Sequence, residues 1–305
     1  MSAFAFLGAL EIGLIYGLVA LGVYLTFRVL DFPDLSVDGS FPMGAAVAAT
    51  AIVAGINPWL ATGMAIVAGG MTGWVTAFLA VRCGILHLLA SILTMIAAFS
   101  INIRIMGRPN IALLGEDTIL TPFESISDGM FIRPLVVGVL VLFSAFFIIR
   151  LLNSDFGLGL RATGVNARMV RAQGGSTAFY TYFGLVLSNA FVGFAGALFA
   201  QTNSFADVTS GVGTIVVGLA AVILGQTLIP GRKIWVAVCA VIIGSVLYRL
   251  AVAFALSSGM FGLQASDLNL VTAVLVAVAL IAPKMKAQYK AKQQIKIARD
   301  TTEGT

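Results

Sequence analysis

Long apolar stretches, separated by short polar breaks, run through almost the whole chain. Most of them are close to 20 residues long, which is about the length of helix that crosses roughly 30 Å of hydrocarbon. The pattern therefore predicts an all-α polytopic membrane protein with about nine membrane helices, one of them short or broken. The predicted segments are residues 4–27, 42–56, 58–81, 84–106, 131–152, 180–201, 209–229, 234–256 and 268–282.

The second segment, 42–56, is shorter than the others and follows a stretch rich in proline, glycine and aspartate. We expect a half-helix here, and whether it crosses the membrane completely stays open. Such a break is tolerated only where protein or a water-filled cavity covers the exposed backbone. The first segment has no basic residues before it and is too long for a cleaved signal peptide, so we expect it to be a membrane helix.

The composition agrees with lipid as the solvent. Hydrophobic residues make up 59% of the chain and charged residues only 10%, whereas a soluble domain carries about 25% charged residues. The 33 glycines fit the same picture, because small residues let membrane helices approach closely. The two cysteines, Cys83 and Cys239, have no metal-site or disulfide spacing, and we expect free thiols.

Basic residues gather in the loops of one side of this nine-segment pattern. The positive-inside rule makes that side cytoplasmic, so the net charge of +5 indicates membrane orientation rather than nucleic-acid binding. The pattern places the N-terminus outside and the C-terminus inside, with a membrane domain over 1–283 and a basic cytoplasmic tail over 284–305 near anionic lipid. Before the tail, the basic residues on this side are Arg28, Arg82, Arg150, Arg161, Arg168, Arg171, Arg232 and Lys233.

Signatures of catalysis are missing from the sequence. The single histidine, His87, has no cysteine or carboxylate at ligand spacing. The stretch 225–233 resembles a phosphate-binding loop only superficially, because the spacing between its glycines is wrong and no serine or threonine follows its lysine. We therefore expect no catalytic residues, no metal and no cofactor in this chain.

The segment 155–174 is too short and too basic to cross the membrane. Glycines punctuate its first part, and 165–173 is typical of a short helix closed by Gly174 and Gly175. Two interpretations remain open. The segment is either a basic anchor at the membrane face or a coupling helix that docks on a motor subunit.

Three stretches resemble permeases of the branched-chain amino acid and ribose class of ABC importers. They are Leu160-Arg161-Ala162-Thr163-Gly164 through Ala172-x-Gly174, Gly17 to Thr26 followed by Asp34-Leu35-Ser36-Val37-Asp38-Gly39-Ser40, and Gly193-x-x-Gly196 into Val222 to Gly225. This chain departs from the ribose-type pattern by inserting Asp38. The likeness covers residues 8 to 283, and residues 27–34 resemble a branch linked with aromatic amino acid uptake.

The resemblance implies a permease in the bacterial inner membrane. Its expected partners are a separate ABC ATPase subunit, a periplasmic or lipoprotein solute-binding protein and a second permease copy, with an amino acid as the expected solute; sugars and nucleosides stay open. It also implies that the cytoplasmic segment couples to the ATPase. The residues that match this coupling segment are Arg161, Thr163, Gly164, Asn166, Arg168, Arg171 and Gly174.

Polar residues between and within the apolar segments are candidates for the translocation pathway. Asp31, Asp34 and Asp38 have a spacing that fits one helical face, where they either cap the following helix or form a cation site. The family resemblance implies that this loop lies beside the translocation pathway. In the fourth segment His87, Ser91, Thr94 and Asn102 form a polar stripe, which fits pore lining or hydrogen bonding between helices. The predicted pathway residues are Asp34, Ser36, Asp38, Ser91, Thr94, Asn102 and Asn189.

Four further charged residues carry separate hypotheses. Arg108 and Arg133 lie in an outer loop and are candidates for docking the binding protein. Glu11 and Arg249 are the charged residues well inside predicted spans, at similar depth, so we consider an ion pair between them as well as two separate environments. The alternative function is an ion-coupled secondary transporter, which needs titratable or oxygen-rich sites near the middle of the membrane.

Overall fold

A computed structural model describes residues 3–124, 129–231 and 233–257, together with the isolated residues 274, 277 and 281. Most of these residues are helical. The elements are α1 (Ala3–Val23), the π-helical turn η1 (Tyr24–Val29), α2 (Val37–Val53), α3 (Pro58–Ala77), the π-helical turn η2 (Phe78–Arg82), α4 (His87–Met106), β1 (Asn110–Ala112), α5 (Thr121–Glu124), α6 (Gly129–Leu152), α7 (Asp155–Ala172), α8 (Thr177–Asn203), β2 (Phe205–Asp207), the 3₁₀ turn η3 (Val208–Gly211), α9 (Thr214–Leu228) and α10 (Ile234–Ser257).

Seven stretches within the described residues are long and apolar enough to cross a membrane. This finding confirms the polytopic helical class, whereas the expected total of about nine is not reached in this part of the chain. The segment 268–282, the boundary at residue 283 and the tail 284–305 lie outside the described residues. The seven stretches are Phe4–Val29, Pro58–Arg82, His87–Met106, Phe131–Leu152, Thr177–Asn203, Val208–Leu228 and Ile234–Ala255.

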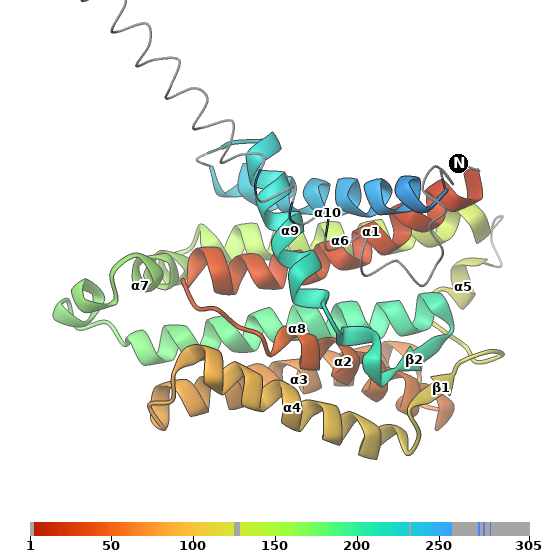
Figure 1. Ribbon diagram of the computed structural model, residues 1–305, viewed down its shortest axis with the longest axis horizontal. Helices are drawn as coiled ribbons and strands as arrows, with labels where there is room; N and C mark the ends of the chain where they lie inside the picture. The colour runs from red at the N-terminus through yellow and green to blue at the C-terminus, as the bar shows by residue number, and fades with distance from the viewer. Residues whose placement is uncertain are drawn as a thin grey trace, which may run out of the picture.

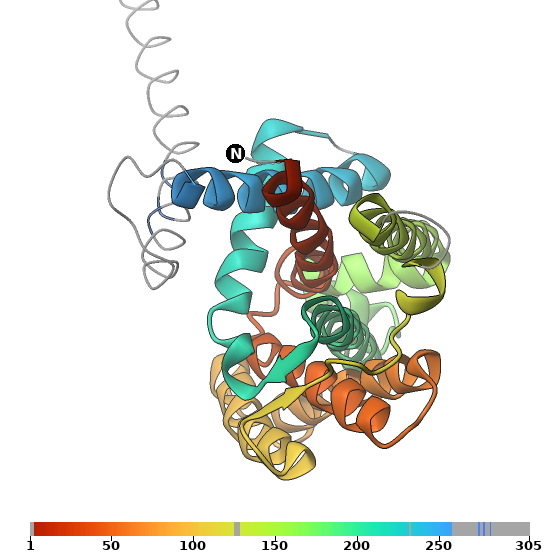
Figure 2. The same cartoon turned by 90° about the vertical axis from the view of Figure 1, so that its right-hand side faces the viewer.

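The long helices lie side by side along the long axis of the molecule (Figure 1). The chain begins at one end of this bundle, near α5, β1 and β2, and we call this the N-terminal end. The opposite end carries α7, and we call it the α7 end. Viewed from the N-terminal end, α8 occupies the centre of the bundle (Figure 2), and it packs against α1, α2 and α3.

The helix expected to be short or broken is α2. After α1 and its π-helical turn, the chain turns back along the bundle, so that α2 begins about halfway along it (Figure 1). Asp31 makes this reversal with a positive φ of 53°, a conformation that aspartate tolerates better than most residues. The helix starts at Val37 rather than at residue 42, and it continues through Pro42, so the sequence prediction began the helix too late.

Glycines bring α2, α3 and α8 into close contact. A Cβ atom added at Gly44 would overlap the Gly193 backbone, and one added at Gly196 would overlap the Phe41 carbonyl. Gly69 of α3 fits equally closely against the α8 backbone. Backbones that approach this closely leave no room for side chains, as is typical of membrane helix interfaces. Gly193 and Gly196 therefore serve the packing of α8 against its neighbours.

Two short strands correct the all-α prediction. Strand β1 pairs with β2 in an antiparallel register, with Asn110 opposite Asp207 and Ala112 opposite Phe205. Each strand has three residues, which is too short for alternation of polar and apolar residues to be recognised in the sequence. The pair joins the loop after α4 to the chain just after α8.

Candidate functional site

A group of polar side chains is buried where α2 begins, and we call it the polar junction. It consists of Asp34, Ser36, Ser40, Thr72 and Asn189, all of them buried. One carboxylate oxygen of Asp34 accepts hydrogen bonds from the Ser36 backbone N–H (2.9 Å) and hydroxyl (2.5 Å). The other accepts a hydrogen bond from the Asn189 amide at 2.8 Å. The junction therefore joins the start of α2 to α8.

Asn189 has a second role in the polar junction. Its side-chain oxygen accepts hydrogen bonds from Ser40 (2.5 Å) and Ser36 (3.3 Å), and Ser40 also shares a short hydrogen bond with Thr72 of α3. Buried polar groups are costly unless they are paired, and these groups satisfy one another across three helices. The sequence prediction included Asp34, Ser36 and Asn189 but missed Ser40 and Thr72. The spacing of Ser36 and Ser40, one helical turn apart, is the signal that points to Ser40.

Asp38 makes a different contact from Asp34. Its carboxylate accepts hydrogen bonds from the backbone N–H groups of Gly213 (3.2 Å) and Ile215 (2.7 Å), at the first turn of α9. A helix N-terminus has unpaired N–H groups and a partial positive charge, and Gly213 offers no side chain to cap it. Asp38 supplies that cap from another helix. The N-terminal turns of α2 and α9 therefore meet inside the bundle.

This arrangement corrects the prediction that three aspartates share one helical face. Asp31 is exposed in the reversal, Asp34 lies in the polar junction, and Asp38 caps α9. The capping interpretation holds for Asp38, but the capped helix is α9 and not the helix that follows in the sequence.

We expect Asp38→Ala to destabilise the protein by about 1–2 kcal/mol, because two N–H groups at the start of α9 lose their acceptor. Asp38→Asn keeps one acceptor oxygen and should lose less. The measurement is the midpoint of thermal unfolding in detergent. Asp117→Ala, an exposed loop position, is the control. Equal midpoints for Asp38→Ala and this control would contradict the capping role.

A cavity of about 280 Å³ lies beside Asp38, between α2, α4 and η3. Apart from Asp38 and Ser100 its walls are mainly apolar, including Pro42, Met95 and Phe99. The cavity combines one carboxylate with apolar and aromatic walls, which is the composition common in sites for small molecules.

Apart from His87, the predicted polar stripe of α4 is buried against the rest of the bundle. Ser91 and Thr94 donate hydrogen bonds to carbonyls of their own helix, and the Asn102 amide lies 3.4 Å from the Gly39 carbonyl of α2. The side-chain oxygen of Asn102 has no hydrogen-bond partner within the described residues. His87 is exposed and stacks on Phe32 with ring centroids 4.2 Å apart. Hydrogen bonding between helices therefore accounts for Asn102.

The segment expected to contain a short helix over 165–173 is helical from Asp155 to Ala172, with a break at Asn166. The glycines before the break are helical as well. The helix after it is confirmed: the Asn166 side chain accepts a hydrogen bond from the Met169 N–H at 3.0 Å, and Gly174 has the positive φ of a helix-closing glycine. The glycines pack tightly: a Cβ at Gly164 would overlap the Val29 carbonyl.

The predicted coupling residues divide into two groups. Thr163 is buried and donates a hydrogen bond to the Gly159 carbonyl, and Arg161 is half-buried. Three of the predicted coupling residues from the break onward have exposed side chains, namely Asn166, Arg168 and Arg171. The exposed group lies at the α7 end of the bundle (Figure 1).

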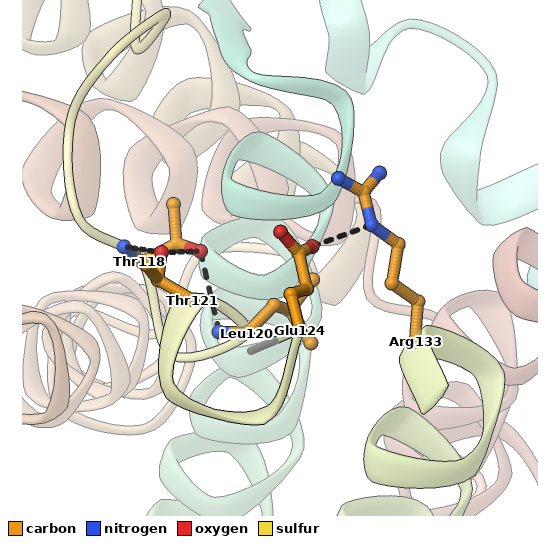
Figure 3. Close-up of polar contacts among 5 residues, drawn as sticks. All are labelled: Thr118, Leu120, Thr121, Glu124 and Arg133. Atoms are coloured by element: carbon orange, nitrogen blue, oxygen red, sulfur yellow. Dashed lines mark hydrogen bonds and ion pairs between the residues drawn. The ribbon is translucent and has the colours of Figure 1, made fainter. Parts of the chain in front are cut away.

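At the N-terminal end, Arg133 of α6 forms an ion pair with Glu124 of α5, with 2.6 Å between Nε and Oε1. Figure 3 shows the two side chains facing each other, next to the Thr118 and Thr121 hydroxyls that hold the turn before α5. Arg108 is exposed between α4 and β1. Arg133 therefore has a partner within this chain, whereas Arg108 is directed to the surface.

The proposed ion pair between Glu11 and Arg249 is wrong. The Arg249 guanidinium lies over the Tyr16 ring, 5.1 Å from its centroid. Glu11 is buried, and its Oε1 atom has no hydrogen-bond partner among the described residues. Helices α1 and α10 do pack together, but an aromatic face takes the place of the carboxylate as the partner of the arginine.

Comparison with known proteins places these features in a family. Residues 5–282 match the model described as the permease component of the branched-chain amino acid transport system. The chain is 37% identical over 278 residues to the tyrosine transport system permease protein of Clostridioides difficile, covering 91% of this chain and 90% of that protein. It is 25% identical over 277 residues to the probable branched-chain amino acid transport permease protein LivH of Methanocaldococcus jannaschii, covering 85% and 86%.

The fold is also similar to that in a solved structure, PsaBC from Streptococcus pneumoniae in complex with Fab. The TM-score is 0.50 at 18% identity, with 90% of this chain and 89% of that chain covered. At this identity the match shows the fold alone. The assignment to a family rests on the family model and on the C. difficile relative. The chain belongs to the family of permease components of branched-chain amino acid transport systems, the membrane-spanning subunits of ABC-type transport systems.

Proposed function

We propose that this chain and a second permease copy form the path through which an ATP-driven importer moves an amino acid across the bacterial inner membrane. The observation that supports this proposal is the meeting of α2 and α9 inside the bundle, where Asp38 joins their N-terminal turns. Transporters commonly place solute sites near the middle of the membrane, at helices that are interrupted there. An interrupted helix exposes polar backbone that a continuous helix hides.

The proposed path passes the cavity beside Asp38. There Phe99, Met95 and Pro42 offer an apolar surface, and Asp38 offers a negative charge for an ammonium group. Asp34, Ser36 and Asn189 are fully buried in the polar junction, so we assign them the role of holding α2 in its interrupted position beside the path. Ser91, Thr94 and Asn102 line the buried side of α4 in the same region.

The relative from C. difficile is named as a tyrosine transport system permease. A cavity with an aromatic wall and a carboxylate suits an amino acid with an aromatic side chain, and we propose this class as the solute. Energy for transport comes from a separate ATPase that docks on the exposed part of α7, at the α7 end, which we assign to the cytoplasm together with the C-terminus. We assign Arg108, at the opposite end, to the docking of a solute-binding protein, where Arg133 contributes through its pair with Glu124.

The test is uptake of labelled tyrosine into liposomes that contain the permease with its ATPase and binding protein. We expect uptake to require ATP hydrolysis and to persist when ionophores collapse sodium and proton gradients. Phenylalanine should compete with tyrosine, and ribose should not. Uptake that needs an ion gradient and no ATP would instead identify a secondary transporter.

A pair of variants tests the cavity itself. Phe99→Ala removes an aromatic wall of the cavity and is expected to lower the rate of tyrosine uptake several-fold. The matched control is Phe143→Ala, because Phe143 is 71% exposed on the outer face of α6. Equal uptake by the two variants would show that the path does not pass through this cavity.

A further inference from the structure

A second, larger cavity opens at the α7 end of the bundle, with a volume of about 910 Å³. It lies between η1, the middle of α7 and the connection from α9 to α10. Three of its lining residues are cationic, namely Arg28, Arg161 and Lys233, and none of the lining residues is acidic. Arg28 and Lys233 are exposed, whereas Arg161 is half-buried.

These cations have no acidic partner in the part of the chain that the structure describes. Among the described residues, the ion pair present is that between Arg133 and Glu124. Arg161 makes one long contact, 3.4 Å from its Nε atom to the Gly157 carbonyl. Like charges gathered around one space repel each other, and an anion in that space would relieve the repulsion.

Apart from Tyr24 and Gln226, the other walls of this cavity are apolar. They include Val29 at the end of the span Phe4–Val29, and Ile234 and Ala237 at the start of the span Ile234–Ala255. The cavity thus combines cationic groups with apolar residues at the ends of two candidate membrane spans. Basic pockets between membrane helices at the membrane face bind the headgroups of anionic phospholipids.

We propose that this cavity binds an anionic phospholipid, with the phosphate between Arg28, Arg161 and Lys233 and the acyl chains against α10. A lipid reaches the cavity laterally along the membrane spans that form its walls. An acidic side chain of a soluble partner would instead have to insert between the ends of these spans. The lipid joins η1, α7 and the α9–α10 connection, so it holds α7 against the bundle.

The experiment uses the purified full-length permease and measures retained and added phospholipid by native mass spectrometry. We expect phosphatidylglycerol to bind at least tenfold more tightly than phosphatidylcholine. The double variant Arg28→Gln/Lys233→Gln should lose this preference. The matched control, Arg82→Gln/Arg150→Gln, removes two cations near the same end that do not line the cavity, and it should keep the preference.

A third variant separates the cavity from general surface charge. Ala237→Phe fills the apolar wall and leaves every cation in place, so it should weaken phosphatidylglycerol binding as well. Size-exclusion chromatography checks that each variant is folded. Inorganic phosphate is added as a competitor, because the same cations suit a free phosphate ion.

Four results would overturn the proposal. The first is equal binding of the two lipids by the unchanged protein, and the second is equal loss in the cavity variant and the control. The third is displacement of the lipid by millimolar phosphate, which would identify a site for the free ion. The fourth is a cross-link from the cavity to the ATPase that added phosphatidylglycerol does not reduce, which would identify a protein as the occupant.

Discussion

Gly73→Val is expected to prevent the helical bundle from assembling, whereas Gly63→Val on the same helix is expected to leave it intact. A Cβ atom at Gly73 would overlap the Leu185 carbonyl of α8 and would lie 2.9 Å from the Asn189 side-chain amide. Carbonyl oxygens of a packed helix cannot move aside without moving the helix. Overpacking of this kind costs about 1–3 kcal/mol or more, and here it also displaces a member of the polar junction.

Gly63 is the matched control because it is exposed on α3 and nothing lies within 4 Å of a Cβ added there. The intrinsic cost of valine in a helix is the same at both positions, so the difference between the variants reports packing. The measurement is the fraction of detergent-extracted protein that elutes as a single folded species, together with its midpoint of thermal unfolding. Similar results for both variants would show that α3 and α8 do not pack as described.

Reversing two exposed charges on α7, in the variant Arg168→Glu/Arg171→Glu, is expected to abolish the stimulation of ATP hydrolysis by transport while the permease stays folded. Both side chains are exposed, so the change should cost little stability. Charge reversal at a docking surface replaces attraction with repulsion and can cost several kcal/mol of binding. We therefore expect at least a tenfold fall in stimulated hydrolysis by the reconstituted complex.

The control for this prediction is Arg82→Glu, a charge reversal at the end of η2 and outside α7. Normal stimulation of ATP hydrolysis in the α7 variant would contradict docking. It would support the other interpretation of the sequence, in which segment 155–174 is a basic anchor at the membrane face. Gly164 is a poor probe of docking, although its sequence match suggested it. Because Gly164 packs against the Val29 carbonyl, Gly164→Trp would disrupt the fold, and a loss of activity would not report docking on a partner.

The sequence predicts the membrane spans well because their signal is local. A run of about 20 apolar residues must leave water wherever it lies in the chain, so the ends of α3, α4 and α8 fall close to the predicted ones. The start of α2 was harder to predict. Its boundary depends on Asp34 and Ser36 and on their partner Asn189, 155 residues away from Asp34 in the chain.

The functional geometry depends even more on contacts between distant residues. Asp38 and the N–H group of Ile215 are 177 residues apart, and no periodicity links them. The hypothesis of an ion pair between Glu11 and Arg249 failed for the same reason. The similar depth and opposite charge of the two residues suggested a pair, but the side chain of Tyr16 lies next to Arg249. The packing of neighbouring helices decides which of their residues face each other.

The two short strands connect the N-terminal end of the molecule to the chain that leads into α9. Beyond the paired residues, the Leu113 N–H bonds to the Ser204 carbonyl and the Val208 N–H to the Pro109 carbonyl, which extends the pairing at both ends. Strand β2 runs directly into η3, and from there the chain reaches Gly213, which is bonded to Asp38. A hydrogen-bonded path of a few residues of extended and turn backbone therefore connects β1, at the N-terminal end, to the first turn of α9.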